Sequence, residues 1–316
     1  MLNVLDYFKI IQKSKTNLSL FFLFGFSLGL MTLANFNIAH GSHLEVNTTK
    51  ISENIYLIHG AGADVILFDG TDGVILVDDQ YAPVTDKMKL LISNITTNPI
   101  KFVINTHLHP DHTGGNKKLG EAGTMIISHD NVRKRLSEDQ FYVFINQTVS
   151  SLSEKGLPIL TFSENMTIYQ NNEKIVLIHL DNGHTDGDSI VFFTNNNVVH
   201  TGDVFSDRTY PFIDIPHGGS VKGFISSLEK ILLTINNETK VVGGHSGISN
   251  QTEVKNYLDM FLDVSNKINN MILEGKSLDE IIMSKPTSKY DAIYNDHSFV
   301  KPNDFIENIY AGLIKR

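Results

Sequence analysis

The stretch Thr106–Gly115 constrains this chain more than any other, because it packs three histidines and an aspartate into six consecutive residues directly after an apolar run. Side chains alternate along an extended segment, so His107 and His109 point to the same side. The Pro-Asp turn then redirects the chain, which lets Asp111 and His112 face a second point. Neutral imidazole and carboxylate suit zinc, with iron and manganese as alternatives. One loop can therefore supply ligands to two metal ions.

Three later motifs carry the same kinds of side chain, and each follows an apolar, strand-like run: Gly183-His184-Thr185, Gly202-Asp203 and Gly244-His245-Ser246. Ligands at the ends of core strands are held rigidly, as a metal site requires. Together with the preceding His-x-His-x-Asp-His, this order of motifs resembles the metallo-β-lactamase superfamily over roughly Val46 to Gly247. The resemblance implies an α/β fold, a four-layer αββα sandwich with the metals at one edge.

The resemblance also implies a set of ligands for two Zn²⁺ ions, with Fe or Mn as alternatives. One ion takes His107, His109 and His184, the other takes Asp111, His112 and His245, and Asp203 bridges them. Two such ions hold a hydroxide at neutral pH, and this hydroxide attacks an ester-, lactone- or amide-like carbonyl while Asp111 orients it. Asp78 is expected to hydrogen-bond the metal loop from behind, and Asp79 is its rival for that role.

Asp203 separates branches of the superfamily. The commonest zinc β-lactamases have a cysteine at this place, and another subclass lacks a bridging carboxylate. A bridging aspartate resembles the glyoxalase II, lactonase and general hydrolase branches. The leading prediction is a dinuclear zinc hydrolase, and β-lactam hydrolysis is the main alternative. A mononuclear iron enzyme similar to persulfide dioxygenases, and a binding protein without turnover, also remain open.

Composition narrows the partners of this 316-residue chain. The net charge of −9 argues against a nucleic-acid partner, which would require a basic face, so a small-molecule substrate is expected. The chain has no cysteine, which excludes disulfides, cysteine-based zinc sites and a cysteine nucleophile. The sequence does not predict the oligomeric state or the identity of the substrate.

The N-terminal segment has the pattern of an export signal. Three lysines precede Leu18–Ala34, a run without charge. We expect residues 1–39 to be a signal peptide or an uncleaved membrane anchor, and either would place the catalytic domain outside the cytoplasm, periplasmic or secreted. The catalytic domain is expected over residues 44–250, and residues 251–316 are expected to form a C-terminal helical appendage.

Periodicity predicts short strands between the motifs and helices around them. Residues 138–165 follow neither period cleanly, and we expect a helix-containing excursion there. His129 lies at a strand end outside the motifs, and a capping or surface role is expected. The loop of residues 204–219 follows the bridging aspartate, so we predict that at least one of Arg208, Tyr210 and His217 faces the cleft and contacts substrate.

Overall fold

The computed structural model describes residues 46–60, 62–143, 145–295 and 299–315. The predicted signal peptide or anchor over residues 1–39 therefore lies outside the described residues. Among the helices of the described part, none combines the length and the apolar character needed to cross a membrane.

The first sheet has seven strands in the order β1-β2-β3-β4-β5-β6-β9. An antiparallel meander, β1 to β4, is followed by strands that pair in parallel. The bounds are β1 Asn47–Lys50, β2 Ile55–His59, β3 Val65–Phe68, β4 Val74–Val77, β5 Ile100–Ile104, β6 Met125–His129 and β9 Leu160–Phe162. Every residue of β3 and β4 is buried, because both faces of this sheet are covered.

The second sheet has six strands in the order β10-β11-β12-β13-β14-β15. Its strands are β10 Asn165–Gln170, β11 Glu173–His179, β12 Ser189–Phe193, β13 Val198–His200, β14 Lys240–Val242 and β15 Ile248–Ser249. The helix α6, Val221–Thr234, links β13 to β14 and begins at Ser220, whose side chain accepts a hydrogen bond from the Gly223 N–H. The helices after β15 are α7 Gln251–Leu273, α8 Leu278–Met283, α9 Asp291–Tyr294 and α10 Pro302–Ile314.

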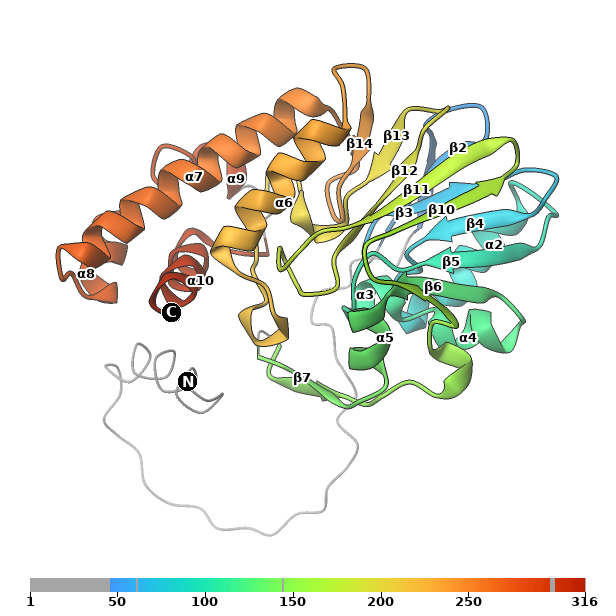
Figure 1. Cartoon of the computed structure of the whole chain (residues 1–316), viewed down its shortest axis with the longest axis horizontal. Helices are drawn as coiled ribbons and strands as arrows, with labels where there is room; N and C mark the ends of the chain where they lie inside the picture. The colour runs from blue at the N-terminus through green and yellow to red at the C-terminus, as the bar shows by residue number, and fades with distance from the viewer. Residues whose placement is uncertain (1–45, 61, 144, 296–298, 316) are drawn as a thin grey trace, which may run out of the picture. The chain divides into compact units, whose positions relative to one another are not determined.

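The two sheets face each other across one apolar core and carry helices outside, so the predicted αββα sandwich is confirmed (Figure 1). Apolar side chains of β2 to β6 meet those of β11 to β14 between the sheets. The helices α2, Thr85–Ser93, and α4, Asn116–Glu121, cover the first sheet. The helices α6, α7 and α10 cover the second sheet. This arrangement leaves the strand ends that carry the predicted ligands at one edge.

The expected helix-containing excursion over residues 138–165 is mostly extended, and its helical part within the described residues is one short 3-10 helix. These residues form a small hairpin, β7 Gln140–Tyr142 and β8 Gln147–Val149, followed by the 3-10 turn η2, Glu154–Gly156, and by β9. Asn146 has φ 51°, a left-handed conformation that asparagine tolerates better than most residues and that favours a tight turn. Three-residue strands are too short to display a readable alternation of apolar and polar side chains.

Candidate metal centre

Every predicted ligand lies in a turn that follows a strand. His107 and His109 follow β5, and Asp111 and His112 lie in the one-turn helix α3, Pro110–Thr113. His184 lies in the turn between β11 and β12, while Asp203 is in the 3-10 turn η3, Gly202–Val204, after β13. His245 follows β14. The fold brings all seven side chains together in two adjoining clusters.

The first cluster joins His107, His109, His184 and Asp203. The Asp203 Oδ2 atom lies 3.7 Å from His107 Nε2 and 3.6 Å from His184 Nε2. His184 Nε2 lies 2.9 Å from His109 Nδ1. Ligand atoms of a tetrahedral zinc ion are about 3.3 Å apart when each bond is about 2.0–2.1 Å. The donor set and its spacing therefore fit one ion.

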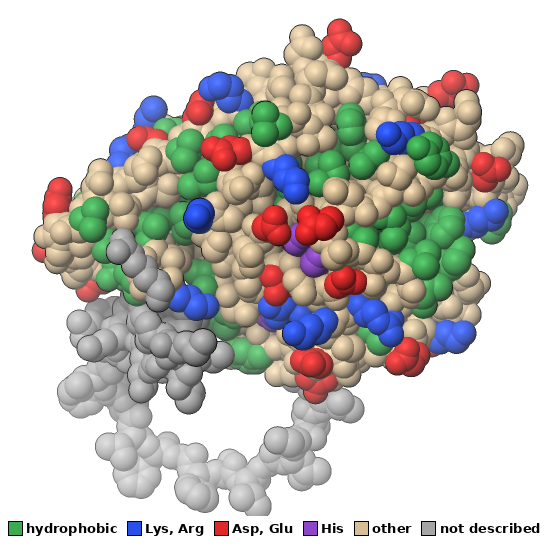
Figure 2. Space-filling model, viewed as in Figure 1, with side chains coloured by type: hydrophobic (Ala, Val, Ile, Leu, Met, Phe, Trp, Pro, Cys, Tyr) green, Lys and Arg blue, Asp and Glu red, His purple; other side chains and the backbone are tan. Residues whose placement is uncertain are grey.

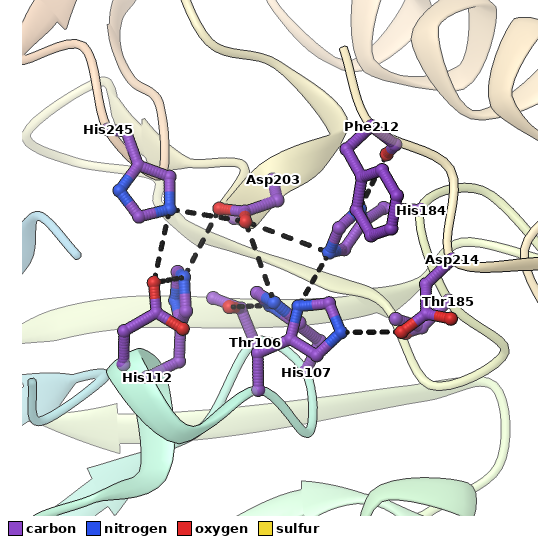
Figure 3. Close-up of polar contacts among 12 residues, drawn as sticks. Thr106, His107, His112, His184, Thr185, Asp203, Phe212, Asp214 and His245 are labelled. Carbon is purple, nitrogen blue, oxygen red and sulfur yellow. Dashed lines mark hydrogen bonds and ion pairs between the residues drawn. The ribbon is translucent and has the colours of Figure 1, made fainter. Parts of the chain in front are cut away.

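The second cluster joins Asp111, His112 and His245. The Asp111 Oδ2 atom lies 3.3 Å from His245 Nε2 and 3.5 Å from His112 Nε2. Asp203 reaches this cluster as well, because its Oδ1 lies 3.2 Å from His112 Nε2 and its Oδ2 lies 3.2 Å from His245 Nε2. Figure 3 shows Asp203 between His112 and His245 on one side and His107 and His184 on the other. A single carboxylate thus joins the two clusters.

Buried polar atoms at the centre support metal binding independently. His107 Nε2, His112 Nε2 and Asp203 Oδ1 are buried and make no well-aligned hydrogen bond within the described residues, although His112 Nε2 and Asp203 Oδ1 lie 3.2 Å apart. Leaving such atoms unpaired is costly, so they are rare in native proteins and call for an explanation. Cations between these atoms would satisfy all three. The residues present therefore fit metal ions at this place.

The outward-facing atoms of the ligands are held by the protein. His112 Nδ1 lies 2.7 Å from Asp78 Oδ2, His109 Nε2 lies 2.8 Å from Asp214 Oδ2, and His184 Nδ1 donates to the Phe212 carbonyl oxygen at 2.7 Å. Such partners fix the ring orientation and leave the other nitrogen free to bind a metal. The nitrogens left for a metal ion are therefore His112 Nε2, His109 Nδ1 and His184 Nε2.

The expected role of Asp78 is confirmed. Besides contacting His112, its carboxylate accepts hydrogen bonds from the Thr106 N–H at 2.7 Å and the Thr106 hydroxyl at 2.8 Å. Asp78 has φ 63°, a conformation that few residues other than glycine adopt and that commonly marks strain at a functional site. The rival Asp79 holds the loop elsewhere, by accepting from the Gly115 N–H at 2.8 Å.

The protonation states of the histidines at the centre differ from ring to ring. Burial lowers the pKa of His107 well below its usual value, and burial lowers the pKa of His184 to about 4, so both rings are neutral at pH 7. Burial opposes ionisation of Asp203, but the His245, His112 and His107 rings hold its pKa well below its usual range. The Asp214 carboxylate instead raises the pKa of His109 although burial opposes this, and the Asp203 carboxylate, against the same effect of burial, raises the pKa of His245 to about 9. An imidazole must be neutral to bind a cation, so a metal ion would displace the protons of these rings.

The loop residues predicted to contact substrate have three different placements. The Tyr210 prediction is corrected: its hydroxyl donates to Asp291 Oδ1 at 2.8 Å, and its ring stacks on Phe305 among the C-terminal helices. Arg208 is exposed. His217 adjoins the centre, because its Nδ1 lies 2.6 Å from the Asp214 oxygen that contacts His109.

Asp214, which contacts the predicted ligand His109, was not singled out from the sequence. Asp214 is 5% exposed. Burial opposes ionisation of its carboxylate, but hydrogen bonds from His109 and His217 hold the pKa of Asp214 far below its usual range. The spacing of Asp214 and His217, three residues apart beside a proline, was the available signal. It did not indicate which ligand the pair would meet.

A family model described as the metallo-beta-lactamase superfamily matches residues 49–245. The chain belongs to the metallo-beta-lactamase superfamily. Among curated superfamily relatives, it is 27% identical over 150 residues to the hydroxyacylglutathione hydrolase of Pelagibacter ubique (strain HTCC1062), which covers 46% of this chain and 52% of that protein. It is 21% identical over 234 residues to the metallo-beta-lactamase type 2 of Elizabethkingia meningoseptica, covering 71% of this chain and 88% of that protein.

Solved structures place this superfamily member beside two kinds of enzyme. A metallo-beta-lactamase from Pontibacter korlensis aligns with a TM-score of 0.59 and 17% identity, over 69% of this chain and 100% of that one. An inverting sec-alkylsulfatase from Pseudomonas sp. aligns with a TM-score of 0.65 and 14% identity, over 84% and 50%. At these identities the likeness concerns the fold. The chain spans about half the length of two curated relatives, 52% of the hydroxyacylglutathione hydrolase and 49% of a 2,4-dinitroanisole O-demethylase subunit alpha from Nocardioides sp. (strain JS1661).

Proposed function

We propose that this protein is an exported dinuclear zinc hydrolase that cleaves an ester-, lactone- or amide-like bond of a small molecule. The observation that carries the proposal is the position of Asp203, whose carboxylate lies within 3.7 Å of ligand nitrogens from both clusters. One carboxylate shared by two clusters is the donor set of a pair of ions rather than of one ion. Relatives named as hydrolases support the same reaction class.

The residues of the centre have different roles in the proposed hydrolysis. Divalent ions at these ligands would supply a lowered pKa of bound water and polarisation of an acyl oxygen. The buried first cluster keeps His107 and His184 neutral, while the second cluster is more open, with the His245 side chain 38% exposed. The Asp111 carboxylate, which is 15% exposed, is placed to orient a water molecule for attack on the acyl carbon. Asp78 and Asp214 keep His112 and His109 in position.

Hydrolysis of β-lactams is the second candidate function. It is favoured by the similarity to the enzyme of Elizabethkingia meningoseptica, which extends over 88% of that protein. Asp203 favours the ester- and lactone-cleaving hydrolases over the β-lactamases, because the commonest zinc β-lactamases have a cysteine at this position. A mononuclear iron centre is disfavoured by the second ligand cluster, which would then have no ion to bind.

The expected partners and location belong to the same proposal. On the face drawn in Figure 2, Lys and Arg side chains are interspersed with Asp and Glu, which supports a small-molecule substrate over a nucleic acid. The charge pattern of residues 1–39 supports export to the periplasm or medium, with or without an anchor in the membrane.

Metal analysis and a substrate screen test this function. The purified protein should contain two zinc ions per chain and should hydrolyse at least one of a lactone, a β-lactam or a thioester, with a phosphodiester as the comparison substrate that has no acyl carbon. Asp203→Ala should lose both ions and the activity. One iron per chain together with oxygen consumption on a persulfide would contradict the proposal. Fractionation of the native host tests export, and intact protein in the soluble cytoplasmic fraction would exclude it.

A further inference from the structure

His245 depends on the turn that carries it more than the other ligands depend on theirs. It is the most exposed histidine ligand, with 38% of its side chain accessible, and it lies in the short turn Gly243–Gly247 between β14 and β15. Gly247 has φ 71°, a left-handed conformation that makes the turn tight. The position of the His245 ring therefore follows from how this turn is fixed.

Asp64 holds both halves of that turn. Its backbone N–H donates to the Gly244 carbonyl oxygen at 2.7 Å, and its carboxylate Oδ2 accepts from the Gly247 N–H at 2.6 Å. The other carboxylate oxygen contacts the His59 ring at Nδ1. Asp64 is 1% exposed, and buried carboxylates are retained only when they are paired in this way. Two hydrogen bonds thus flank His245, on the residue before it and on the second residue after it.

Gln80 holds the segment that carries Asp64. The Gln80 amide oxygen accepts from the Gly62 N–H at 2.8 Å, and its amide nitrogen donates to the Ala63 carbonyl oxygen. Gln80 is fully buried and lies two residues after Asp78, the aspartate behind the metal loop. The first sheet, through β4 and the β2–β3 turn, thereby determines where the second sheet presents His245.

We propose that Asp64 is a positioning residue that sets the affinity of the second metal cluster. It acts through the turn, since its contacts are with Gly244 and Gly247 rather than with the His245 ring. The first cluster takes its histidines from other turns, so loss of the Asp64 side chain leaves them in place. The Asp64 carbonyl oxygen, which contacts His200 close to Asp203, is kept in every Asp64 variant. This inference rests on the two-ion centre proposed above. It assigns a metal-site role to a residue on the opposite half of the sandwich.

Titration of the metal-free, full-length protein with Zn²⁺ in a calorimeter tests the role of Asp64. The unaltered protein should show two binding events. Asp64→Ala should keep the first event within about twofold and weaken the second by about 10–100-fold, the usual effect of removing a group that orients a ligand. Asp64→Ser is too short to reach Gly247 and should behave alike, so it decides the test if the alanine variant does not fold. Asp64→Asn keeps an acceptor for Gly247 and should restore most of the affinity.

Glu173→Ala is the matched control. Glu173 is 2% exposed and also fixes a turn through backbone N–H groups, accepting from Asn195 at 2.7 Å and Asn196 at 3.1 Å. It belongs to the turns at the far end of β11, so both zinc affinities should stay unchanged. Wild-type affinity at both clusters in the Asp64 variants, or equal weakening of both, would overturn the inference. A single binding event in the unaltered protein would instead overturn the dinuclear proposal.

Discussion

Single residues set the tolerance of the centre, and Gly244 shows how narrow that tolerance is. A Cβ atom built on Gly244 would lie 1.8 Å from Asp203 Oδ1, which is far inside contact distance. Glycine is therefore required here by the close approach of the carboxylate to the backbone. Gly244, the residue before His245, therefore also leaves room for the Asp203 carboxylate.

Gly244→Ala should abolish metal binding at both clusters, because the added methyl group displaces the carboxylate that they share. Metal content after dialysis should fall from two ions per chain to fewer than one, measured by mass spectrometry of the metals. Gly275→Ala is the control, since that glycine has a positive φ of 80° but nothing within 4 Å of an added Cβ. It should cost some stability through backbone strain and keep both ions. Two bound ions in Gly244→Ala would show that Asp203 can move without loss.

Asp214→Ala should weaken the first cluster by about 10–100-fold, because His109 loses the carboxylate that orients its ring. Zinc titration of the metal-free protein measures this. Asp214 also bonds His217, so His217→Ala separates the two contacts and should have the smaller effect on affinity. Equal weakening by both variants would indicate that His217, not the direct contact, positions His109.

Tyr210→Phe should affect stability alone. The variant removes the hydrogen bond to Asp291 and should cost about 1 kcal/mol of unfolding free energy, with metal content and turnover unchanged. Urea unfolding and steady-state kinetics on the substrate found by the screen measure the two effects. A fall in turnover with two ions still bound would restore the role in substrate contact that the sequence suggested.

At the scale of elements, α5, Asp130–Leu136, begins at an unusual residue. The His129 side chain accepts a hydrogen bond from the Asn131 N–H at 3.2 Å through Nδ1, which confirms the expected capping role. Its Nε2 faces the Ser163 carbonyl oxygen at 3.1 Å, and its ring stacks on His179 at 3.7 Å. Burial lowers the pKa of His129, and the nearby His179 ring lowers it further. Protonation at Nδ1 would remove the cap.

Acidification should therefore destabilise the protein through His129. The folded-state pKa lies below the unfolded value of about 6.5, so the unfolded chain binds the proton first as the pH falls. This contribution to stability is complete above pH 7 and is lost as the pH falls through 6.5 towards the folded pKa. His129→Asn keeps a good capping side chain that does not titrate. Urea unfolding between pH 5 and pH 8 should show a flatter profile for the variant, and parallel profiles would contradict the prediction.

Across the whole molecule, the C-terminal helices share a core with the second sheet. Phe261 of α7 stacks on Phe224 of α6 at 4.8 Å, and Tyr257 meets Phe205 at 5.3 Å. These residues belong to one buried cluster that also includes side chains of β12, β13 and β14. The helices after residue 250 thus complete the outer layer over the second sheet.

Phe261→Ala should lower the unfolding free energy by about 3–5 kcal/mol, because it opens a cavity in this shared core. Zinc affinity of the folded variant should be unchanged, since the ligands come from other turns. Leu273→Ala, at a site that is 68% exposed on the same helix, should stay within about 0.5 kcal/mol of the unaltered protein. Urea unfolding measures both. Equal, small losses would show that α7 packs more loosely than its burial indicates.

Much of the architecture was accessible from the sequence because it rests on local patterns. The alternation of apolar runs and Gly-containing turns predicted the strands of both sheets, and the spacing within Thr106–Gly115 indicated a metal loop. A capping role could be proposed for His129 because a cap and its helix are adjacent in sequence. The hairpin at residues 140–149 could not be predicted, because strands of three residues show no readable alternation of apolar and polar side chains.

Only the tertiary structure decided which distant groups hold the ligands. Asp214 is 105 residues from His109, and Asp64 is 183 residues from Gly247. Tyr210, close in sequence to the bridging Asp203, turns instead to Asp291, 81 residues further on. Ligand types and strand ends follow from short-range periodicity, which a single sequence displays. Hydrogen-bond partners across the sandwich depend on how the two sheets pack, and a local sequence pattern does not show which distant residues the packing brings together.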